Sequence, residues 1–376
     1  MRKESYNKFQ FSPEYLFLTK FSAYTLTEKL KVECEELLSE KLDWDLIIEL
    51  ANYHAVSPVI YRNLKYLDAI ALLAPEHSKA LRKEYHANFI KNTTLIEQFG
   101  ILKKEIFSAG LKFLPIKGIL FLYLFPEHTA LRQMSDIDIL INPDDARQFI
   151  DIISAHGYVP KGDTNLFKKF GNEISLTKEV NKIFIHIELQ CRVKALNEKL
   201  WFDFGSVMQG SSFDAELALY LPSPADSFMM NFIHIQKHIY QGKEIFKWIA
   251  SDAEFLRRYL SSSEIETLSE RLGLSYRKKF LRYCRQLDAW FDLGKFEHPD
   301  ELEVLSPAFD FSKKEEKNFL KLAIGTFAYT RGLKEKILFA FSRLSPGTGK
   351  DTNGDESGIR SRLKRIMYLI KKLFIR

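Results

Sequence analysis

Hydrophobic and polar positions follow different patterns in different parts of this 376-residue chain. Residues 1–105 carry hydrophobic side chains mostly at helical spacing, which predicts an N-terminal helical region. Residues 106–200 contain short apolar runs separated by polar turns, which is typical of strands and short helices. Helical spacing returns in residues 215–344. The pattern predicts an α+β protein whose sheet-containing core is flanked by N- and C-terminal helical segments.

The predicted core begins with the apolar run 111–116, which is too short for a helix and favours a first strand. We expect a tight turn at Gly118, because glycine tolerates the backbone angles that such turns need. A very apolar segment follows and predicts a short, buried helix. Pro126 disfavours helix at the residue before it and therefore ends this helix.

Two further strand patterns complete the core. Residues 136–141 predict a strand, and a helix follows, with Asn142 as its N-cap and Gly157 at its end. Residues 173–189 predict a hairpin with a polar turn at 178–181. Because the hairpin must pair antiparallel within the core, the sheet is predicted to be mixed.

Two aspartates in the second predicted strand are the leading candidates for chemistry. Asp136 and Asp138 are two positions apart, so a strand directs both side chains to one face, about 7 Å apart at Cα. Ile137 and Ile139 take the opposite face, which we expect to be buried and to fix the register. Carboxylates at this spacing can bind one or two Mg²⁺ ions, which promote phosphoryl transfer. The same pattern also occurs as a solvated strand end, so it leaves both interpretations open.

A third acid lies on the hairpin. In its second strand His186 and Glu188 alternate with apolar residues and share one face. If this strand lies beside residues 136–141, Glu188 joins the two aspartates. His234 and His238 have helical i, i+4 spacing, but the Glu of a His-Glu-x-x-His motif is absent, so we interpret them as packed histidines.

With these residues in place, the chain resembles the nucleotidyltransferase (polymerase-beta-like) superfamily, specifically its branch of uncharacterised nucleotidyltransferases. The resemblance covers roughly residues 40–260. The matching residues are Lys117-Gly118, Arg132, the strand 136–141, Gly157-Tyr158 and Ile187-Glu188-Leu189. Weaker matches lie outside the core, at Asp43-Trp44-Asp45, His54, Pro58, His234, His238, Lys247-Trp248 and Asp252.

The resemblance implies transfer of a nucleoside monophosphate from a triphosphate such as ATP to an unidentified acceptor, with Mg²⁺ or Mn²⁺ as cofactor. It assigns Asp136, Asp138 and Glu188 as metal ligands, with Glu188 also the candidate base. It assigns the nucleotide contacts to Lys117, Gly118, Arg132 and Ser135. Asp252 could reach the site from the C-terminal helical region.

The chain departs from the superfamily pattern at three positions. Ile119 follows Gly118 where Gly-Ser or Gly-Gly is usual, Glu188 replaces the usual Asp, and Gln190 stands where this branch commonly has His. These departures favour an alternative, a catalytically degenerate nucleotide-binding or scaffold protein with the same fold. A metal-dependent glycosyltransferase also uses Asp-x-Asp, but usually after several βα units, whereas one strand and one helix precede the pair here.

Charge and cysteine content narrow the function classes. The net charge is +6, but residues 359–376 hold seven Lys and Arg and no acid, which leaves 48 basic against 49 acidic residues elsewhere. Nucleic acid is therefore not an expected partner of the core. The three cysteines, at positions 34, 191 and 284, are far apart and form no Cys-x-x-Cys pair, which argues against a disulfide framework and a structural zinc site.

The basic C-terminal segment has its own prediction. Residues 345–358 have the composition of a flexible linker, and residues 359–376 fit a basic amphipathic helix. Such a helix either binds an anionic membrane surface weakly or packs on the protein with its basic face in solvent. Since no apolar run is long enough to span a bilayer and the N-terminus lacks a signal-peptide pattern, we expect a cytoplasmic protein, with peripheral contact at the inner membrane surface as the further option.

Overall fold

The computed structural model describes residues 13–161, 173–194, 201–241 and 244–296. The linker and basic helix predicted for residues 345–358 and 359–376 lie outside the described residues, as does the end of the predicted C-terminal helical region. The boundaries of the predicted segments remain predictions.

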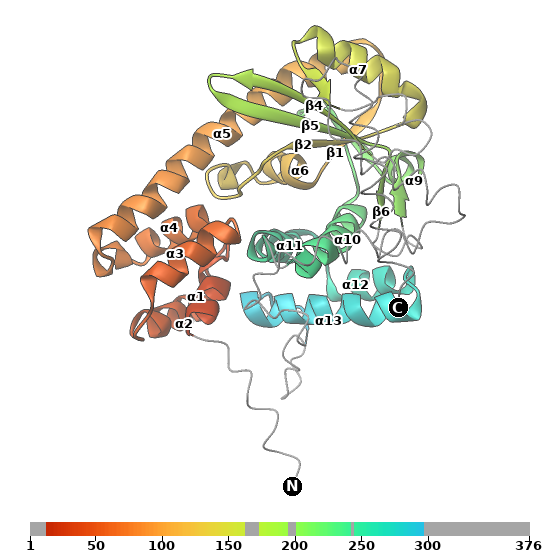
Figure 1. Cartoon of the computed structure of the whole chain (residues 1–376). Coiled ribbons are helices and arrows are strands. Elements are labelled where there is room, and N and C mark those ends of the chain that lie inside the picture. The colour runs from red at the N-terminus through yellow and green to blue at the C-terminus, as the bar shows by residue number, and fades with distance from the viewer. Residues whose placement is uncertain (1–12, 162–172, 195–200, 242–243, 297–376) are drawn as a thin grey trace, which may run out of the picture.

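The described chain before the sheet is helical, as the hydrophobic spacing predicted. The elements are α1 (Pro13–Phe21), α2 (Glu28–Leu38), α3 (Trp44–Tyr53), α4 (Ser57–Tyr66), the 3-10 helix η1 (Ala69–Leu72) and α5 (Pro75–Ser108). Helix α5 has 34 residues and is therefore about 50 Å long at roughly 1.5 Å per residue. It packs on α3 and α4 and also reaches α7 beside the sheet (Figure 1).

A five-stranded mixed sheet forms the core, which confirms the predicted fold class. Its strands are β1 (Phe113–Ile116), β2 (Ile137–Ile141), β3 (Val159–Lys161), β4 (Glu173–Val180) and β5 (Ile183–Gln190), in the spatial order β1-β2-β5-β4-β3. Strand β2 runs parallel to β5, and the other neighbouring pairs are antiparallel. This topology brings the two strands with acidic residues side by side.

The β4–β5 hairpin is confirmed, but its turn is shorter than predicted. Pairing continues to Val180 and Ile183, so the turn consists of Asn181 and Lys182 rather than residues 178–181. Both turn residues have positive φ, 50° and 66°. Two consecutive left-handed residues make the type I′ turn that matches the twist of a hairpin, and Asn tolerates this conformation.

Helices cover both faces of the sheet (Figure 1). On one side lies α6 (Lys117–Leu124), followed by η2 (Pro126–His128), and on the other lies α7 (Ala146–Ala155), which η3 (Pro143–Asp145) precedes. Asn142 caps η3 rather than α7: its side chain accepts a hydrogen bond from the Asp144 N–H at 3.2 Å, and α7 begins after this 3-10 turn, at Ala146. Gly157, with φ of 83°, follows the helix.

Two small hairpins with a short helix between them, and then four longer helices, follow the sheet in the described residues. The hairpins are β6 (Arg192–Lys194) with β7 (Trp201–Asp203) and, after α9 (Phe204–Gln209), β8 (Ser212–Asp214) with β9 (Leu219–Leu221). The hairpins were not predicted, because three-residue strands are too short to show an alternating pattern. The helices are α10 (Pro224–Gln241), α11 (Ile245–Tyr259), α12 (Ser262–Glu270) and α13 (Leu274–Phe291).

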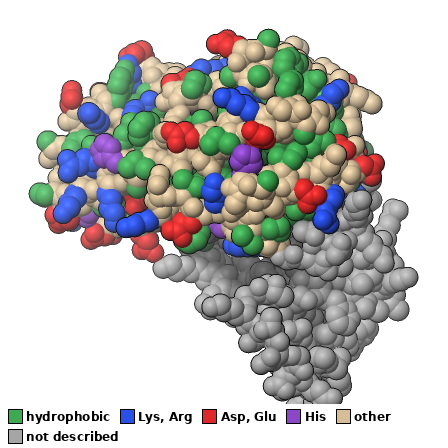
Figure 2. All heavy atoms as spheres, turned by 90° about the horizontal axis from the view of Figure 1, so that it is seen from above, with side chains coloured by type: hydrophobic (Ala, Val, Ile, Leu, Met, Phe, Trp, Pro, Cys, Tyr) green, Lys and Arg blue, Asp and Glu red, His purple; other side chains and the backbone are tan. Residues whose placement is uncertain are grey.

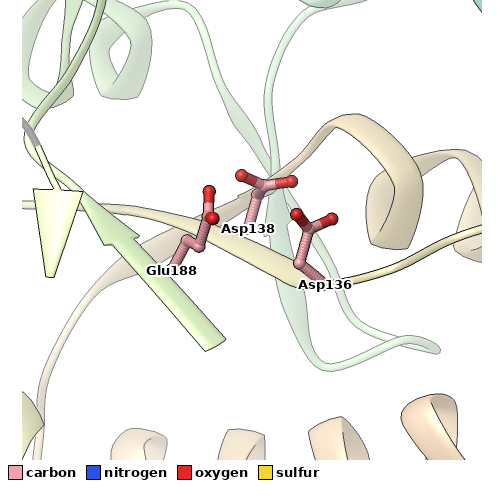
Figure 3. A group of neighbouring side chains, drawn as sticks. All are labelled: Asp136, Asp138 and Glu188. Atoms are coloured by element: carbon pink, nitrogen blue, oxygen red, sulfur yellow. The ribbon is translucent and has the colours of Figure 1, made fainter. Parts of the chain in front are cut away.

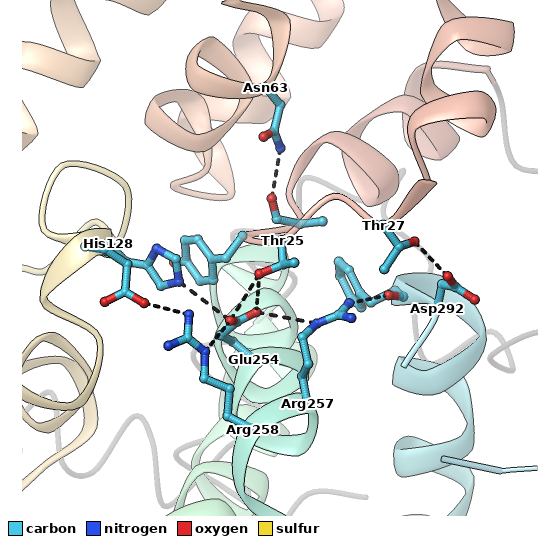
Figure 4. A network of polar contacts seen from close by, with 12 residues as sticks. Thr25, Thr27, Asn63, His128, Glu254, Arg257, Arg258 and Asp292 are labelled. Atoms are coloured by element: carbon cyan, nitrogen blue, oxygen red, sulfur yellow. Dashed lines mark hydrogen bonds and ion pairs between the residues drawn. The ribbon is translucent and has the colours of Figure 1, made fainter. Parts of the chain in front are cut away.

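A polar network centred on Glu254 joins the N-terminal helices to the C-terminal ones (Figure 4). Glu254 is 2% exposed and accepts hydrogen bonds from Thr25 at 3.2 Å and from Arg258 at 2.9 Å. Nearby, Thr27 donates to Asp292 at 2.7 Å. Burial opposes ionisation of Glu254, but contacts with His128 and Arg258 outweigh it and lower the pKa of this carboxyl. The helical segments therefore meet through a buried, charged contact.

The described surface shows mixed charge. In Figure 2, acidic and basic side chains are interspersed over the face seen from above. Within the described ranges, every helix is too short or too polar to cross a lipid bilayer.

His54 lies where the end of α3 meets the start of α11, and we expect it to make the stability of the protein depend on pH. Its ring is 1% exposed, accepts the Ile245 N–H at 3.3 Å and meets the Phe246 ring edge-on at 4.9 Å. Burial lowers the pKa of His54 to about 4, so below the unfolded-state value of about 6.5 the unfolded chain binds the proton more readily. Stability should fall as pH drops from 6.5 towards 4, by about 3 kcal/mol for this group.

Urea unfolding at pH 7.5 and pH 4.5 measures this dependence. The His54→Leu variant should lose less stability between the two pH values than the native protein. His156→Leu, at the end of α7, is the control and should follow the native pH dependence. Equal slopes for native and His54→Leu would contradict the assignment.

Candidate active site

Three carboxylates come together on the sheet (Figure 3). One is on β2, one is on β5, and one belongs to the residue just before β2. Asp138 and Glu188 are direct partners in the parallel β2–β5 register, and Asp136 lies just before β2. One ligand oxygen from each of the three lies within 4.8 Å of the others. In the described part of the chain, no other His, Cys, Asp or Glu residues form a metal-binding group of three or more. Three carboxylate oxygens are a suitable donor set for Mg²⁺ or Mn²⁺.

Asp138 is more deeply placed than the sequence predicted. All five residues of β2 are buried, and Asp138 is 2% exposed rather than facing away from the core. The reason is that its Oδ1 atom accepts from Lys117 Nζ at 2.6 Å and from Gln190 Nε2 at 2.7 Å. Gln190 also donates to Glu188 at 3.3 Å. Lys117 and Gln190 thus cover the acidic face of the strand.

Burial and mutual repulsion set the protonation of these groups. Burial raises the pKa of Asp138, against the opposing effect of the Lys117 ammonium. Burial also raises the pKa of Glu188, and the carboxylates of Asp138 and Asp136 raise it further. For Lys117, burial lowers the pKa, but the Asp138 carboxylate outweighs burial and the net shift is upwards. The Lys117 ammonium is therefore the only cation bonded directly to this group of three carboxylates in the described residues. An additional positive charge, such as that of a metal ion, would reduce their mutual repulsion.

Lys117 and Gly118 do not form the predicted turn. Lys117 itself takes the left-handed conformation, with φ of 56°, and Gly118 lies in the first turn of α6, where it is buried. The glycine is needed for close approach instead. A Cβ at position 118 would lie 2.9 Å from Met134 Sδ and 3.0 Å from Met134 Cγ.

Gly118→Ala should therefore destabilise the protein by about 1–3 kcal/mol, the usual cost of overpacking a core. The destabilisation should come from the clash with Met134, which is 4% exposed. A double-mutant cycle with Met134→Ala, followed by urea unfolding, checks this: the double variant should be more stable than the sum of the single effects predicts. Strict additivity would show that Met134 is not the cause.

The other predicted nucleotide contacts occupy different environments. Arg132 is 2% exposed, and its Cζ lies 4.7 Å from the centre of the Trp248 ring. Ser135 is exposed on the loop directly before Asp136. The loop is fixed from α5, because Asn92 donates to the carbonyls of Thr129 and Arg132 at 2.7 Å each, and Asn88 donates to that of Ala130 at 2.9 Å.

Two lysines near the carboxylates were not among the predicted site residues. Lys91 of α5 and Lys247 of α11 are both largely buried, and burial lowers the pKa of each, with that of Lys247 falling to about 8. The Asp136 carboxylate opposes this shift in both, so both lie within its electrostatic reach. The weak sequence match at Lys247-Trp248 was the available signal for one of them.

The remaining candidates are not members of the group of three carboxylates. His234 and His238 pack on the Trp248 ring, with centroid separations of 4.6 and 5.4 Å, and their Nε2 atoms are 2.9 Å apart. Asp252 is fully buried and accepts a 2.6 Å hydrogen bond from the Tyr283 hydroxyl of α13. Burial raises the pKa of Asp252 to about 7. It belongs to the helix packing rather than to the acidic group.

A mixed sheet between helices, with an acidic group on two adjacent strands, is consistent with the nucleotidyltransferase fold. The comparison with protein families agrees: the model of the uncharacterised nucleotidyltransferase family matches residues 40–292, and the chain belongs to that family. The match spans α3 to α13 and so includes the sheet and parts of both helical regions. Comparisons with curated proteins and with solved structures gave no significant match.

Proposed function

We propose that the protein is a metal-dependent nucleotidyltransferase that moves a nucleoside monophosphate from a triphosphate to an acceptor hydroxyl or similar nucleophile. The observation that carries the proposal is the convergence of Asp136, Asp138 and Glu188, with ligand atoms within 4.8 Å. Membership of the nucleotidyltransferase family supports a nucleotide as the substrate class.

In the proposed reaction the acceptor oxygen attacks the α-phosphorus. The bond to the oxygen bridging the α- and β-phosphates breaks, and pyrophosphate leaves. Glu188 is the proposed acceptor of the proton that the attacking oxygen loses, because the strand register places it directly beside Asp138. A divalent cation held by the three carboxylates would orient the triphosphate and offset the charge that develops on the transferring phosphoryl group.

Lys117 has two roles in this proposal. Without nucleotide, its ammonium neutralises Asp138 across 2.6 Å. If the three carboxylates held a divalent cation, the Lys117 ammonium would be free to contact a phosphate oxygen. Ser135, on the exposed loop beside Asp136, is a further proposed contact to the nucleotide.

Thermal-shift measurements with ATP, GTP, CTP and UTP, each with Mg²⁺ or Mn²⁺, test the proposal. We expect at least one triphosphate to stabilise the native chain in a metal-dependent way, by about 2.7 kcal/mol at 100 times its Kd. The Asp136→Asn/Asp138→Asn variant should lose this stabilisation, because it lacks two of the three ligand carboxylates.

Asp144→Asn/Asp145→Asn is the matched control, since it neutralises two adjacent aspartates just beyond the end of the same strand. It should respond to nucleotide like the native protein. Stabilisation without release of pyrophosphate would favour the degenerate nucleotide-binding protein. No stabilisation by any triphosphate would favour a scaffold and overturn the proposal.

A further inference from the structure

Two buried cations, Arg132 and Lys247, lie against the indole ring of Trp248, next to the three carboxylates. We call these three residues the cation cluster. Arg132 Cζ lies 4.7 Å and Lys247 Nζ 5.8 Å from the ring centre. The two cations come from different parts of the chain, since Arg132 is in the loop before β2 and Lys247 is in α11. Cation–π contacts of this kind hold positive charge over an aromatic ring in a position where water is excluded.

The cluster has more buried positive than negative charge. Arg132 is 2% exposed and Lys247 is 6% exposed. Lys247 forms an ion pair with Glu244 at 2.7 Å, whereas no described acid lies within ion-pair distance of Arg132. Burial and the nearby Arg132 lower the pKa of Lys247, which shows that the two cations repel each other. A buried cation without a direct ion-pair partner is unfavourable, so a bound anion would relieve this arrangement.

Two N–H donors in the cluster also lack acceptors. Arg132 Nε and Trp248 Nε1 are buried and have no hydrogen-bond partner among the described residues. Nearly all buried donors in proteins are paired, and an unpaired one calls for an explanation. Arg132 Nη1 already donates to the Gln133 carbonyl, and an anion with several oxygens would provide acceptors for the two unpaired donors.

The cluster adjoins the site proposed for nucleotidyl transfer. The Asp136 carboxylate acts electrostatically on both Arg132 and Lys247. A metal ion held by Asp136 would share the charge of this carboxylate, which would then compensate the two cations less. An anion with several charged oxygens would restore the balance, and a triphosphate is such an anion.

We propose that Arg132, Lys247 and Trp248 form a subsite for the terminal phosphates of the nucleoside triphosphate. The assignment rests on the proposed function for the identity of the ligand. It means that α11, outside the sheet, completes the donor site. Trp248 positions Arg132 and contributes its indole N–H, and Lys247 supplies a second positive charge.

Isothermal titration of the full chain with inorganic tripolyphosphate, first without metal, tests the subsite. Lys247→Gln should weaken binding on the order of 10- to 100-fold, the range expected for loss of a charge-assisted hydrogen bond. Trp248→Phe keeps an aromatic ring but removes the N–H, and should weaken binding less. Lys112→Gln is the matched control, because Lys112 Nζ lies 5.6 Å from the Tyr220 ring, away from the carboxylates, and it should bind like the native chain.

The metal-free measurement separates this proposal from the nucleotidyl-transfer proposal. Asp136→Asn/Asp138→Asn should keep tripolyphosphate binding, because it removes negative charge beside the cations, even if it shows no transfer. Three results would overturn the subsite: no binding of tripolyphosphate to the native chain, native-like binding by folded Lys247→Gln, or equal weakening by Lys112→Gln. The urea midpoint of each variant establishes that it is folded.

Discussion

Asp136→Asn is expected to slow pyrophosphate release from a nucleoside triphosphate by on the order of 10³-fold. The carboxylate is one of three whose ligand atoms lie within 4.8 Å, and asparagine preserves its shape while removing the charge that holds a cation. Loss of about 4 kcal/mol of transition-state stabilisation corresponds to this factor. With Mn²⁺ and water as a surrogate acceptor, the assay needs no knowledge of the natural acceptor.

Position 136 is better suited to this measurement than position 138. Asp138 neutralises the buried Lys117, so its replacement would also unbalance the core. Asp136 is only partly buried, and we therefore expect the unfolding midpoint of Asp136→Asn to stay close to the native value. Asp144→Asn is the single-residue control and should keep the native rate. An unchanged rate in folded Asp136→Asn would remove this residue from the catalytic group.

Glu254→Ala should cost about 3–5 kcal/mol of folding free energy, the largest stability effect we expect from one substitution. Glu254 is 2% exposed and lies between Thr25, Arg258 and His128. Its removal leaves the Thr25 hydroxyl and the His128 ring without this partner and takes away the buried one of the two carboxylates that pair with Arg258. Chemical unfolding in urea measures the difference.

The neighbouring Glu127 provides a control with the same partner. Glu127 pairs with Arg258 at 2.6 Å, but both side chains are substantially exposed, at 46% and 39%. Exposed pairs contribute little, so Glu127→Ala should cost less than about 1 kcal/mol. Similar losses in the two variants would show that burial of Glu254 does not set the strength of this junction.

The sheet and its acidic residues could be predicted from sequence because they follow from local alternation. In β5, Ile185, Ile187 and Leu189 are buried, as the period-two pattern requires, and this places Glu188 on the opposite face. The prediction that Glu188 joins the two aspartates required β5 to pair with β2. The structure shows this pairing, with Asp138 opposite Glu188. Alternation alone does not identify which strand pairs with β5. A strand that is buried on one face and carries an acid on the other is, however, expected to pair with a strand of the same kind, and β2 is such a strand.

The residues that surround the acids could not be predicted in the same way. Lys91 and Lys247 are in helices before and after the sheet, and helical periodicity gives the buried face of a helix without its partner. The sequence likewise suggested a turn at Gly118, whereas the structure requires a glycine there because Met134, distant in sequence, packs against it. Long-range packing decides such positions, and no local pattern encodes it.

Asn88 and Asn92 hold the loop that precedes β2 by three hydrogen bonds to its carbonyls. This loop contains Arg132 and leads into Asp136, so two of the proposed ligand contacts are already in a fixed conformation before any ligand arrives. Ordering a flexible loop would consume part of the binding energy as lost conformational entropy. Here α5 has incurred that entropic cost during folding, so a bound nucleotide would not have to offset the ordering of this loop.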